Sequence, residues 1–293
     1  LMSKNPLNKI ILGTAQFNDG YGRFNKKYLN DKEIYKIINF CIANKISYLD
    51  TANTYDQVLK ILDKKVLNKF NIIYKFRPTL KKSYLSVIED FFLIKKKFNF
   101  NKLYCFMLHN ENDLNKFKKN YLNSIKKLKK LKIIKKFGVS IYNFSKLEKY
   151  ILDKDIDIIQ LPYNIFDNRF LCRRIQLALK KRKKTLEIHA RSIFLQGLLL
   201  QNSKSEDPII RKNIDLFKKW DVFNKNNRNQ KISNCINYVK NTIKINKVLV
   251  GIDSLKQLKM ISQIFSKNKN QKPVKFNSKI KKNIIDPRKW KKI

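Results

Sequence analysis

Four ionisable side chains of different chemical types follow strand-like apolar segments in succession along the chain. They are Asp50, Tyr55, Lys75 and His109. The apolar segments that they follow or terminate are 46–50, 71–75 and 103–109. An acid, a phenol, an amine and an imidazole held close together can orient and transfer a proton. The sequence therefore predicts a proton-transfer site, provided that the fold brings these strand ends together.

The apolar segments alternate with helix-like segments over most of the chain. Eight runs resemble strands: 9–14, 46–50, 71–75, 103–109, 136–140, 156–160, 187–192 and 248–251. Apolar residues at helical spacing follow most of them, in 31–44, 83–98, 121–131, 171–181, 233–245 and 254–265, and more weakly in 56–67 and 145–152. This alternation predicts an α/β fold with parallel strands.

A single-domain (β/α)8 TIM barrel fits both the alternation and the length of 293 residues, since such barrels use about 250 residues. Their active sites lie at the carboxyl ends of the strands, where the four ionisable residues would meet. We expect the barrel over residues 1–266 and a basic C-terminal tail over 267–293. The segment 202–230 interrupts the alternation, and we expect one short helix near 209–220, over the strand ends.

Composition limits the remaining classes of protein. No segment approaches the ~20 apolar residues of a membrane span, and the first residues lack the apolar core of a secretion signal. The four cysteines are Cys41, Cys105, Cys172 and Cys235, scattered and without a C-x-x-C pair. With only two histidines, a metal site is not expected. These features predict free thiols and a cytoplasmic location.

The formal net charge of +44 allows two interpretations. One is binding to nucleic acid or to an anionic membrane surface. The other is coding bias, because the abundant Lys, Asn, Ile, Phe and Tyr share A/T-rich codons. The lysines are dispersed over different predicted elements, and no nucleic-acid-binding motif accompanies them. We therefore expect solvated helix faces, with no specific nucleic acid and no membrane as partner.

The motif from Asp50 to Tyr55, with Lys75 and His109 at the next two strand ends, resembles the aldo/keto reductase family. The resemblance extends from about Lys9 to Phe265. Two further segments, 13–17 and 191–199, are similar to a bacterial subgroup linked with cell-surface carbohydrate synthesis.

This resemblance implies NAD(P)H-dependent reduction of an aldehyde or ketone, because the family's catalytic Asp, Tyr, Lys and His match the four residues. Tyr55 would give a proton to the carbonyl oxygen, and His109 would polarise the carbonyl by a hydrogen bond. Lys75 would lower the pKa of the Tyr55 phenol, since a nearby ammonium favours phenolate. Asp50 would keep Lys75 charged and oriented. The nicotinamide would supply the hydride.

The resemblance also implies a cofactor site, with NADP(H) favoured over NAD(H). The matching positions are Gly13, Thr14, Asp50, Ser140, Gln160, Arg191, Ser192, Leu195, Gly197, Gly251, Ile252, Ser254 and Gln257. Ser140 and Gln160 would hold the nicotinamide carboxamide. Ser192, Leu195 and Gly197 would follow the pyrophosphate. The absence of a G-x-G-x-x-G motif agrees with a cofactor bound to a barrel rather than to a Rossmann fold.

Several positions depart from the family pattern. Arg191 replaces an aromatic residue that stacks on the nicotinamide, and a cation is unfavourable beside the oxidised ring. The cations that usually hold the 2′-phosphate are replaced by Gly251 and Gln257, and Lys256 or Lys259 are the available substitutes.

Two alternatives to catalysis remain at this stage. One is a regulatory module that binds a nicotinamide cofactor without turnover, and the other is a polyanion-binding protein that retains the barrel. The substrate pocket is expected to be formed by loops 17–24, 165–170 and 202–230. Their aromatic and basic residues suit a sugar-like or anionic carbonyl compound. The sequence predicts no particular oligomeric state.

Overall fold

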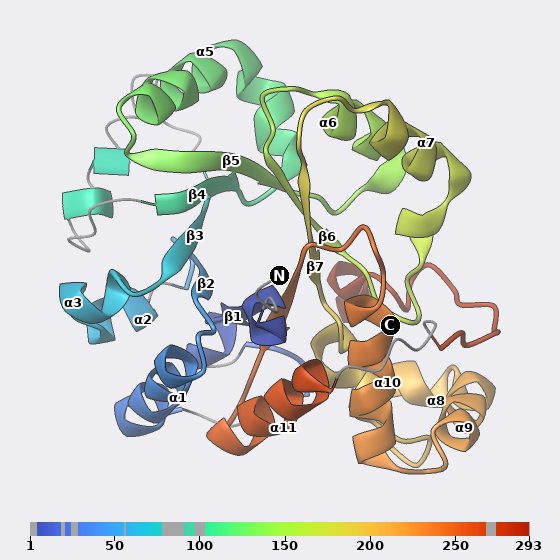
Figure 1. Ribbon diagram of the computed structural model, residues 1–293. Coiled ribbons are helices and arrows are strands. Elements are labelled where there is room, and N and C mark those ends of the chain that lie inside the picture. Colours follow the sequence, from blue (N-terminus) through green and yellow to red (C-terminus); the bar gives the residue numbers. More distant parts are fainter. Residues whose placement is uncertain are drawn as a thin grey trace.

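A computed structural model describes residues 5–18, 21–24, 29–55, 57–77, 91–92, 94–96, 103–267 and 274–292. Within these residues, eight parallel strands close a barrel in chain order (Figure 1). The strands are β1 (Ile10–Gly13), β2 (Tyr48–Ala52), β3 (Asn71–Phe76), β4 (Leu103–Leu108), β5 (Ile134–Ser140), β6 (Ile158–Pro162), β7 (Glu187–Arg191) and β8 (Lys247–Gly251). The predicted (β/α)8 fold and its parallel strands are confirmed.

Helices surround the barrel, and α8 and α9 lie together on one side of it beside α10 (Figure 1). The helices are α1 (Asp31–Ala43), α2 (Gln57–Ile61), α3 (Lys64–Leu67), α5 (Glu111–Lys130), α6 (Leu147–Leu152), α7 (Arg173–Lys181), α8 (Pro208–Arg211), α9 (Ile214–Phe223), α10 (Arg228–Lys240) and α11 (Leu255–Ser266). Short 3-10 turns are η1 (Pro6–Lys9), η2 (Ala15–Phe17), η3 (Phe144–Lys146), η4 (Arg169–Leu171), η5 (Leu195–Leu200) and η6 (Pro287–Lys292). None of the described helices is both long and apolar enough to cross a membrane.

The strand alternation stacks two layers of side chains inside the barrel. The lower layer is an apolar cluster that includes Ile11, Tyr48, Ile73, Met107, Ile158 and Leu249, of which Leu249 also reaches the pocket. Two residues further along the chain, the same strands or their ends present Gly13, Asp50, Lys75, His109, Gln160 and Gly251 to a pocket. Since residues i and i+2 of a strand point the same way, each apolar residue below supports a pocket residue above it.

The strand register keeps the pocket residues at one level. Gly13 pairs with both Asp50 and Gly251, and Ser140 pairs with Gln160. Residues far apart in the sequence therefore meet at the carboxyl end of the barrel, as the strand-end pattern predicts.

A partly buried cluster of polar side chains lies toward the opposite end of the barrel. Glu187 accepts hydrogen bonds from the Tyr104 hydroxyl (2.8 Å) and from Nε2 of His189 (3.0 Å), and it pairs with Lys136. His189 has no exposed surface and therefore belongs to the core.

Several helix boundaries differ from the sequence prediction. α5 begins at Glu111 rather than near 121, because Asn110 accepts a hydrogen bond from the backbone of Asn112 and caps the helix. α10 occupies 228–240 rather than 233–245, because Asn227 caps it five residues earlier than expected. The segment 202–230 contains α8 and α9, with Asn213 between them, instead of one helix. Of the helix expected at 83–98, residues 83–90, 93 and 97–98 lie outside the described residues.

The described part of the C-terminal tail packs on the barrel. Ile284 and Trp290 are buried, and the Trp290 indole donates to the backbone oxygen of Ile284 at 3.1 Å. The residues from 285 to 288 line the pocket at the carboxyl end of the barrel. The tail therefore contributes to the candidate site, which the sequence alone did not predict.

Candidate active site

The four predicted ionisable residues line one pocket of about 660 Å³ at the carboxyl end of the barrel. Asp50 comes from β2, Lys75 from β3 and His109 from the end of β4, while Tyr55 lies in the turn after β2. That turn is fixed by a backbone bridge between Ala52 and Tyr55. The structure thus brings all four side chains together.

Lys75 and Asp50 form a buried ion pair on the floor of this pocket. The Lys75 ammonium lies 2.6 Å from Oδ1 of Asp50, and both side chains are almost fully shielded from solvent. Gln160 bridges the pair, since its amide nitrogen donates to Oδ2 of Asp50 (2.9 Å) and its amide oxygen accepts from Lys75 (3.4 Å). This geometry matches the expected role of Asp50 in holding a charged Lys75 in place.

The half-buried Tyr55 ring contacts three of its neighbours. The Lys75 ammonium lies 5.3 Å from the ring centroid, the His109 ring meets it edge-on at 6.0 Å, and the Tyr21 ring is tilted against it at 6.2 Å. Among the described residues, no hydrogen bond joins Lys75 to the Tyr55 hydroxyl.

The protonation state of Tyr55 follows from these surroundings. Burial raises the pKa of Tyr55 well above its ordinary value, Asp50 adds to this effect, and Arg191 opposes it. The net direction is opposite to the lowering expected from Lys75. Tyr55 is therefore a protonated phenol at neutral pH, and its proton is tightly held in the ligand-free site.

His109 is neutral in this site. Burial, followed by repulsion from Lys75, Arg77 and Arg191, lowers the pKa of His109 to about 3. Its Nδ1 atom is buried and has no hydrogen-bond partner among the described residues. A neutral imidazole has one N–H donor, so His109 can donate to a substrate oxygen without carrying a charge.

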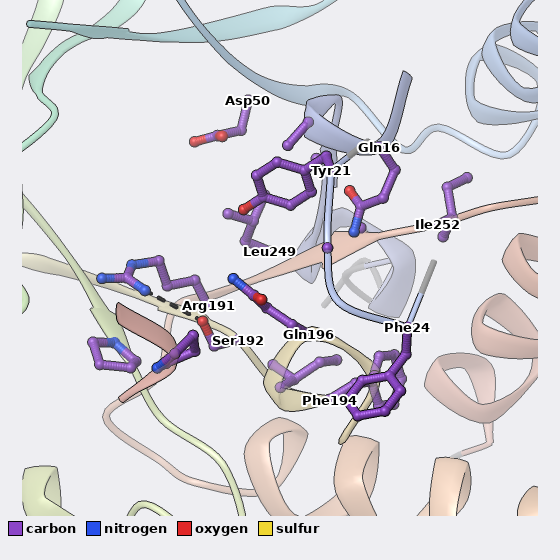
Figure 2. A pocket seen from close by; sticks show the side chains of 18 of the residues that line it. Gln16, Tyr21, Phe24, Asp50, Arg191, Ser192, Phe194, Gln196, Leu249 and Ile252 are labelled. Carbon is purple, nitrogen blue, oxygen red and sulfur yellow. Dashed lines mark hydrogen bonds between the residues drawn. The ribbon is translucent and has the colours of Figure 1, made fainter. Parts of the chain in front are cut away.

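The loop after β7 has an unusual backbone at the pocket wall. Ser192, Leu195 and Gln196 adopt positive φ angles of 57°, 49° and 52°, and Gly197 has φ 90°. Such a run of left-handed residues is costly and is often kept at functional sites. It turns the backbone around the pocket, with Gln196 reaching into the space beside Arg191 and Ser192 (Figure 2).

The loop after β8 forms the opposite wall, ahead of α11. Ser254 caps α11 by accepting from the backbone of Gln257, and the Gln257 side chain accepts from the backbone of Asp253. At Gly251, a Cβ atom would lie only 2.0 Å from Nε2 of Gln16, so the Gln16 amide fills the space that glycine leaves. Neither Gly251 nor Gln257 offers a cation at this end.

Most of the predicted cofactor residues line the pocket. These are Gly13, Asp50, Ser140, Gln160, Arg191, Ser192, Gly197, Gly251, Ile252 and Gln257. Three others support the walls from behind. Thr14 is buried and donates to the backbone oxygen of Asp50 (3.0 Å), Leu195 is fully buried, and Ser254 is the helix cap.

Tyr142 and Arg288 are among the pocket residues that sequence reasoning missed. The backbone nitrogen of Tyr142 donates to the buried carboxylate of Glu111 at 3.1 Å, which fixes the loop after β5. The guanidinium groups of Arg191 and Arg288 lie 4.1 and 4.7 Å from the Tyr142 ring centroid. A signal existed for Tyr142, which follows the end of β5 by two residues, but none for Arg288 in the irregular tail.

Comparisons with known proteins identify the family of the chain. The model of the aldo/keto reductase family matches residues 9–281. The chain belongs to the aldo/keto reductase family. No curated protein sequence matches the chain. The expected family is thus confirmed. As a member of it, the protein is a nicotinamide-dependent oxidoreductase that acts on carbonyl compounds.

Two solved structures of aldo/keto reductases share the fold. One is the holo form of an aldo-keto reductase from Bacillus halodurans, with a TM-score of 0.68, 16% identity, and coverage of 89% of this chain and 87% of that one. The other is a protein of Pseudomonas aeruginosa assigned to the same family, with a TM-score of 0.61, 15% identity, and coverage of 87% and 90%. At such low identity, the likeness concerns the fold.

The pocket of this aldo/keto reductase has the groups that a nicotinamide dinucleotide requires. Ser140 and Gln160 offer a hydroxyl and an amide beside the buried ion pair. The N-terminus of α11, a helix of 12 residues, favours a phosphate group. The buried Nε of Arg191 also lacks an acceptor among the described residues. These residues therefore fit the cofactor.

Proposed function

We propose that this protein reduces an aldehyde or ketone with NADPH, and that Tyr55 delivers the proton. When bound, the nicotinamide supplies the hydride, so the protein must bind the carbonyl group and protonate its oxygen. The Tyr55 hydroxyl would donate its proton to that oxygen. The neutral His109 would donate a hydrogen bond to the same oxygen and orient it.

Lys75 would act during the proton transfer rather than before it. As Tyr55 loses its proton, the phenolate gains a negative charge that the Lys75 ammonium, 5.3 Å from the ring centroid, stabilises. Asp50 pairs with that ammonium, and Gln160 hydrogen-bonds to both groups. Such proton transfer contributes roughly 10² to 10⁴ to the rate.

The observation that carries the proposal is the buried ion pair of Lys75 and Asp50 beneath Tyr55 and His109. A buried pair is a poor source of stability, because its desolvation offsets most of its attraction. A role in proton transfer gives a reason for its presence at the floor of an open pocket.

We further propose NADP(H) rather than NAD(H) as the cofactor. The N-terminus of α11 and the positive charge of the protein favour an additional phosphate. Because Gly251 and Gln257 supply no cation, this preference depends on the helix terminus and on Lys256 or Lys259.

For the substrate, we propose a sugar-like or anionic carbonyl compound. The pocket is lined by hydrogen-bond donors, among them Tyr21, Tyr142, Arg169, Arg228 and Arg288. Donors of this kind suit hydroxyl, carboxylate or phosphate oxygens. A role in cell-surface carbohydrate synthesis and a cytoplasmic location remain predictions of the sequence.

Titration with NADPH, and separately with NADH, tests the cofactor site through the fluorescence of Trp220 and Trp290. We expect quenching with a lower Kd for NADPH. A screen of neutral, sugar-like and anionic aldehydes should then reveal NADPH oxidation at 340 nm. Folded protein that binds neither cofactor would contradict the proposal.

A non-catalytic cofactor-binding module is the second candidate. It is favoured by the raised pKa of Tyr55, which burial and then Asp50 cause and which makes the phenol a weaker acid. Tight cofactor binding without turnover of any carbonyl in the screen would support this candidate over the enzyme.

A further inference from the structure

The cations that line the pocket differ in whether a carboxylate compensates them. Three have an acidic partner: Lys75 with Asp50, Arg169 with Asp167, and Arg288 with Asp286. For Arg191 and Arg228, no carboxylate partner occurs within the described ranges. Arg228 donates to the backbone oxygen of Leu200 (3.3 Å), in the loop after β7.

Arg191 is held firmly although its charge is not compensated. Its two terminal nitrogens donate to the backbone oxygen of Ile141 (3.1 Å) and to the hydroxyl of Ser192 (3.2 Å). Its guanidinium lies over the Tyr142 ring, and Figure 2 shows the side chain reaching from β7 across the pocket wall. The buried Nε has no acceptor among the described residues. Movement away from the pocket would break these contacts.

The field of this guanidinium acts at the reacting centre. Burial is the largest cause of the pKa shifts of Tyr55 and His109, but Arg191 lowers the pKa of both groups. The charge of Lys75 is matched by Asp50. Arg77 also lowers the pKa of His109. Of the cations that line the pocket, Arg191 is therefore the uncompensated one that acts on both Tyr55 and His109.

We propose that Arg191 makes the protein bind the reduced form of its nicotinamide cofactor more tightly than the oxidised form. The inference rests on the proposed function. An oxidised nicotinamide ring is positively charged, whereas the reduced ring is neutral. A ring that reacts beside Tyr55 and His109 is exposed to the field of Arg191, so the guanidinium repels the oxidised form selectively.

This selectivity affects two stages of the reaction in opposite ways. Repulsion from Arg191 opposes the gain of positive charge and so slows the chemical step. The same repulsion speeds the departure of the oxidised cofactor after the reaction. Arg191 is thus a specificity-determining residue for the redox state of the cofactor, and it promotes exchange of the oxidised form for the reduced form.

The ratio of the Kd for NADP⁺ to the Kd for NADPH tests the inference, measured by calorimetry on the wild type and on Arg191→Met. Removing the cation should lower this ratio about tenfold, equivalent to about 1.4 kcal/mol. Arg191→Lys keeps the charge and should keep most of the ratio. Stopped-flow measurements should show slower release of NADP⁺ from Arg191→Met than from the wild type.

Arg228→Met is the matched control, because Arg228 lines the same pocket without a carboxylate partner in the described residues and is not among the main causes of the pKa shifts of Tyr55 and His109. NADP⁺ and NADPH carry the same phosphates, so any loss of phosphate contacts in Arg228→Met should weaken both alike. The ratio of the two Kd values should therefore stay unchanged. If the ratio of the two Kd values is unchanged in Arg191→Met, or falls equally in Arg191→Met and Arg228→Met, the inference is wrong but the proposed function still stands. Failure of the folded wild type to bind either form would overturn the proposed function, and this inference with it.

Discussion

At the scale of single residues, the site depends on a charge pair that contributes little to stability while it is intact. Lys75 and Asp50 lie 2.6 Å apart and are nearly inaccessible to solvent. Their attraction mainly offsets the cost of removing both charges from water. Removal of one partner should lower the free energy of unfolding, because the other charge is then buried without compensation.

Asp50→Asn should therefore lower the free energy of unfolding by about 3–5 kcal/mol, because Lys75 loses its carboxylate. Urea denaturation at pH 7 measures this change. Glu33→Gln is the control, since Glu33 pairs with Lys36 at 3.0 Å on an exposed helix face and should cost less than about 1 kcal/mol. Equal losses in the two variants would contradict the buried, uncompensated charge as the cause.

His109 should remain neutral throughout the physiological range, because burial and nearby cations lower its pKa to about 3. The NMR signals of its ring, identified by their loss in His109→Gln, should not shift between pH 8 and pH 5. A midpoint near 6.5 would contradict the neutral donor role.

The lowered pKa of His109 also affects stability. Unfolded histidine binds a proton near pH 6.5, whereas the folded protein resists protonation of His109 down to about pH 3. The contribution of neutral His109 to the free energy of unfolding is therefore complete above pH 6.5 and is lost as the pH falls toward 3. His109→Gln should weaken the acid-induced loss of stability over this window.

The directions of the side chains at the strand ends were predictable, because successive residues of a strand point alternately into and out of the barrel. Once Ile73 points into the barrel, Lys75 must do so as well, and the same holds for Ile158 and Gln160. The partners of Arg191 were not predictable, since Ile141 and Tyr142 reach it through a loop whose course depends on the buried Glu111.

At the scale of elements, the loops after β1 and β8 are in contact because Gly251 has no side chain, which leaves room for Gln16. A Cβ atom added at position 251 would lie 2.0 Å from Nε2 of Gln16. The amide is the end of a flexible side chain, so it can move if that space is filled. Because Gln16 and Gly251 both line the pocket, we expect the displaced amide to occupy pocket space.

Gly251→Ala should consequently weaken cofactor binding through the displaced Gln16, while stability falls by only about 1 kcal/mol. The double variant Gln16→Ala with Gly251→Ala should recover part of the affinity, which fluorescence titration measures. If the double variant binds no better than the single one, the two loops are not coupled in this way.

Strands were easier to predict than helices for a physical reason. Each strand is an apolar run that lies between the barrel interior and the surrounding helices. α5 and α10, in contrast, begin with polar residues, and their starting points depend on the capping residues Asn110 and Asn227. The tail was unpredictable because Ile284 and Trp290 pack on the barrel without any regular spacing.

At the scale of the whole molecule, self-repulsion should dominate the response to salt, since 66 basic residues face only 22 acidic ones. Raising NaCl from 0.1 to 1 M shortens the Debye length from about 10 to about 3 Å, and we expect the unfolding temperature to rise. KCl should act equally, because screening does not distinguish the cations. A fall in unfolding temperature would show that surface ion pairs outweigh the repulsion.

The central claim is that Tyr55 supplies the proton to the reduced carbonyl. A single-turnover experiment with Tyr55→Phe and saturating NADPH tests it, using the best substrate of the carbonyl screen. We predict unchanged cofactor affinity and a rate of NADPH oxidation lower by about 10² to 10⁴. Phenylalanine keeps the ring that contacts Lys75, His109 and Tyr21, so the fold should be retained. Wild-type single-turnover rates in this variant would contradict the account.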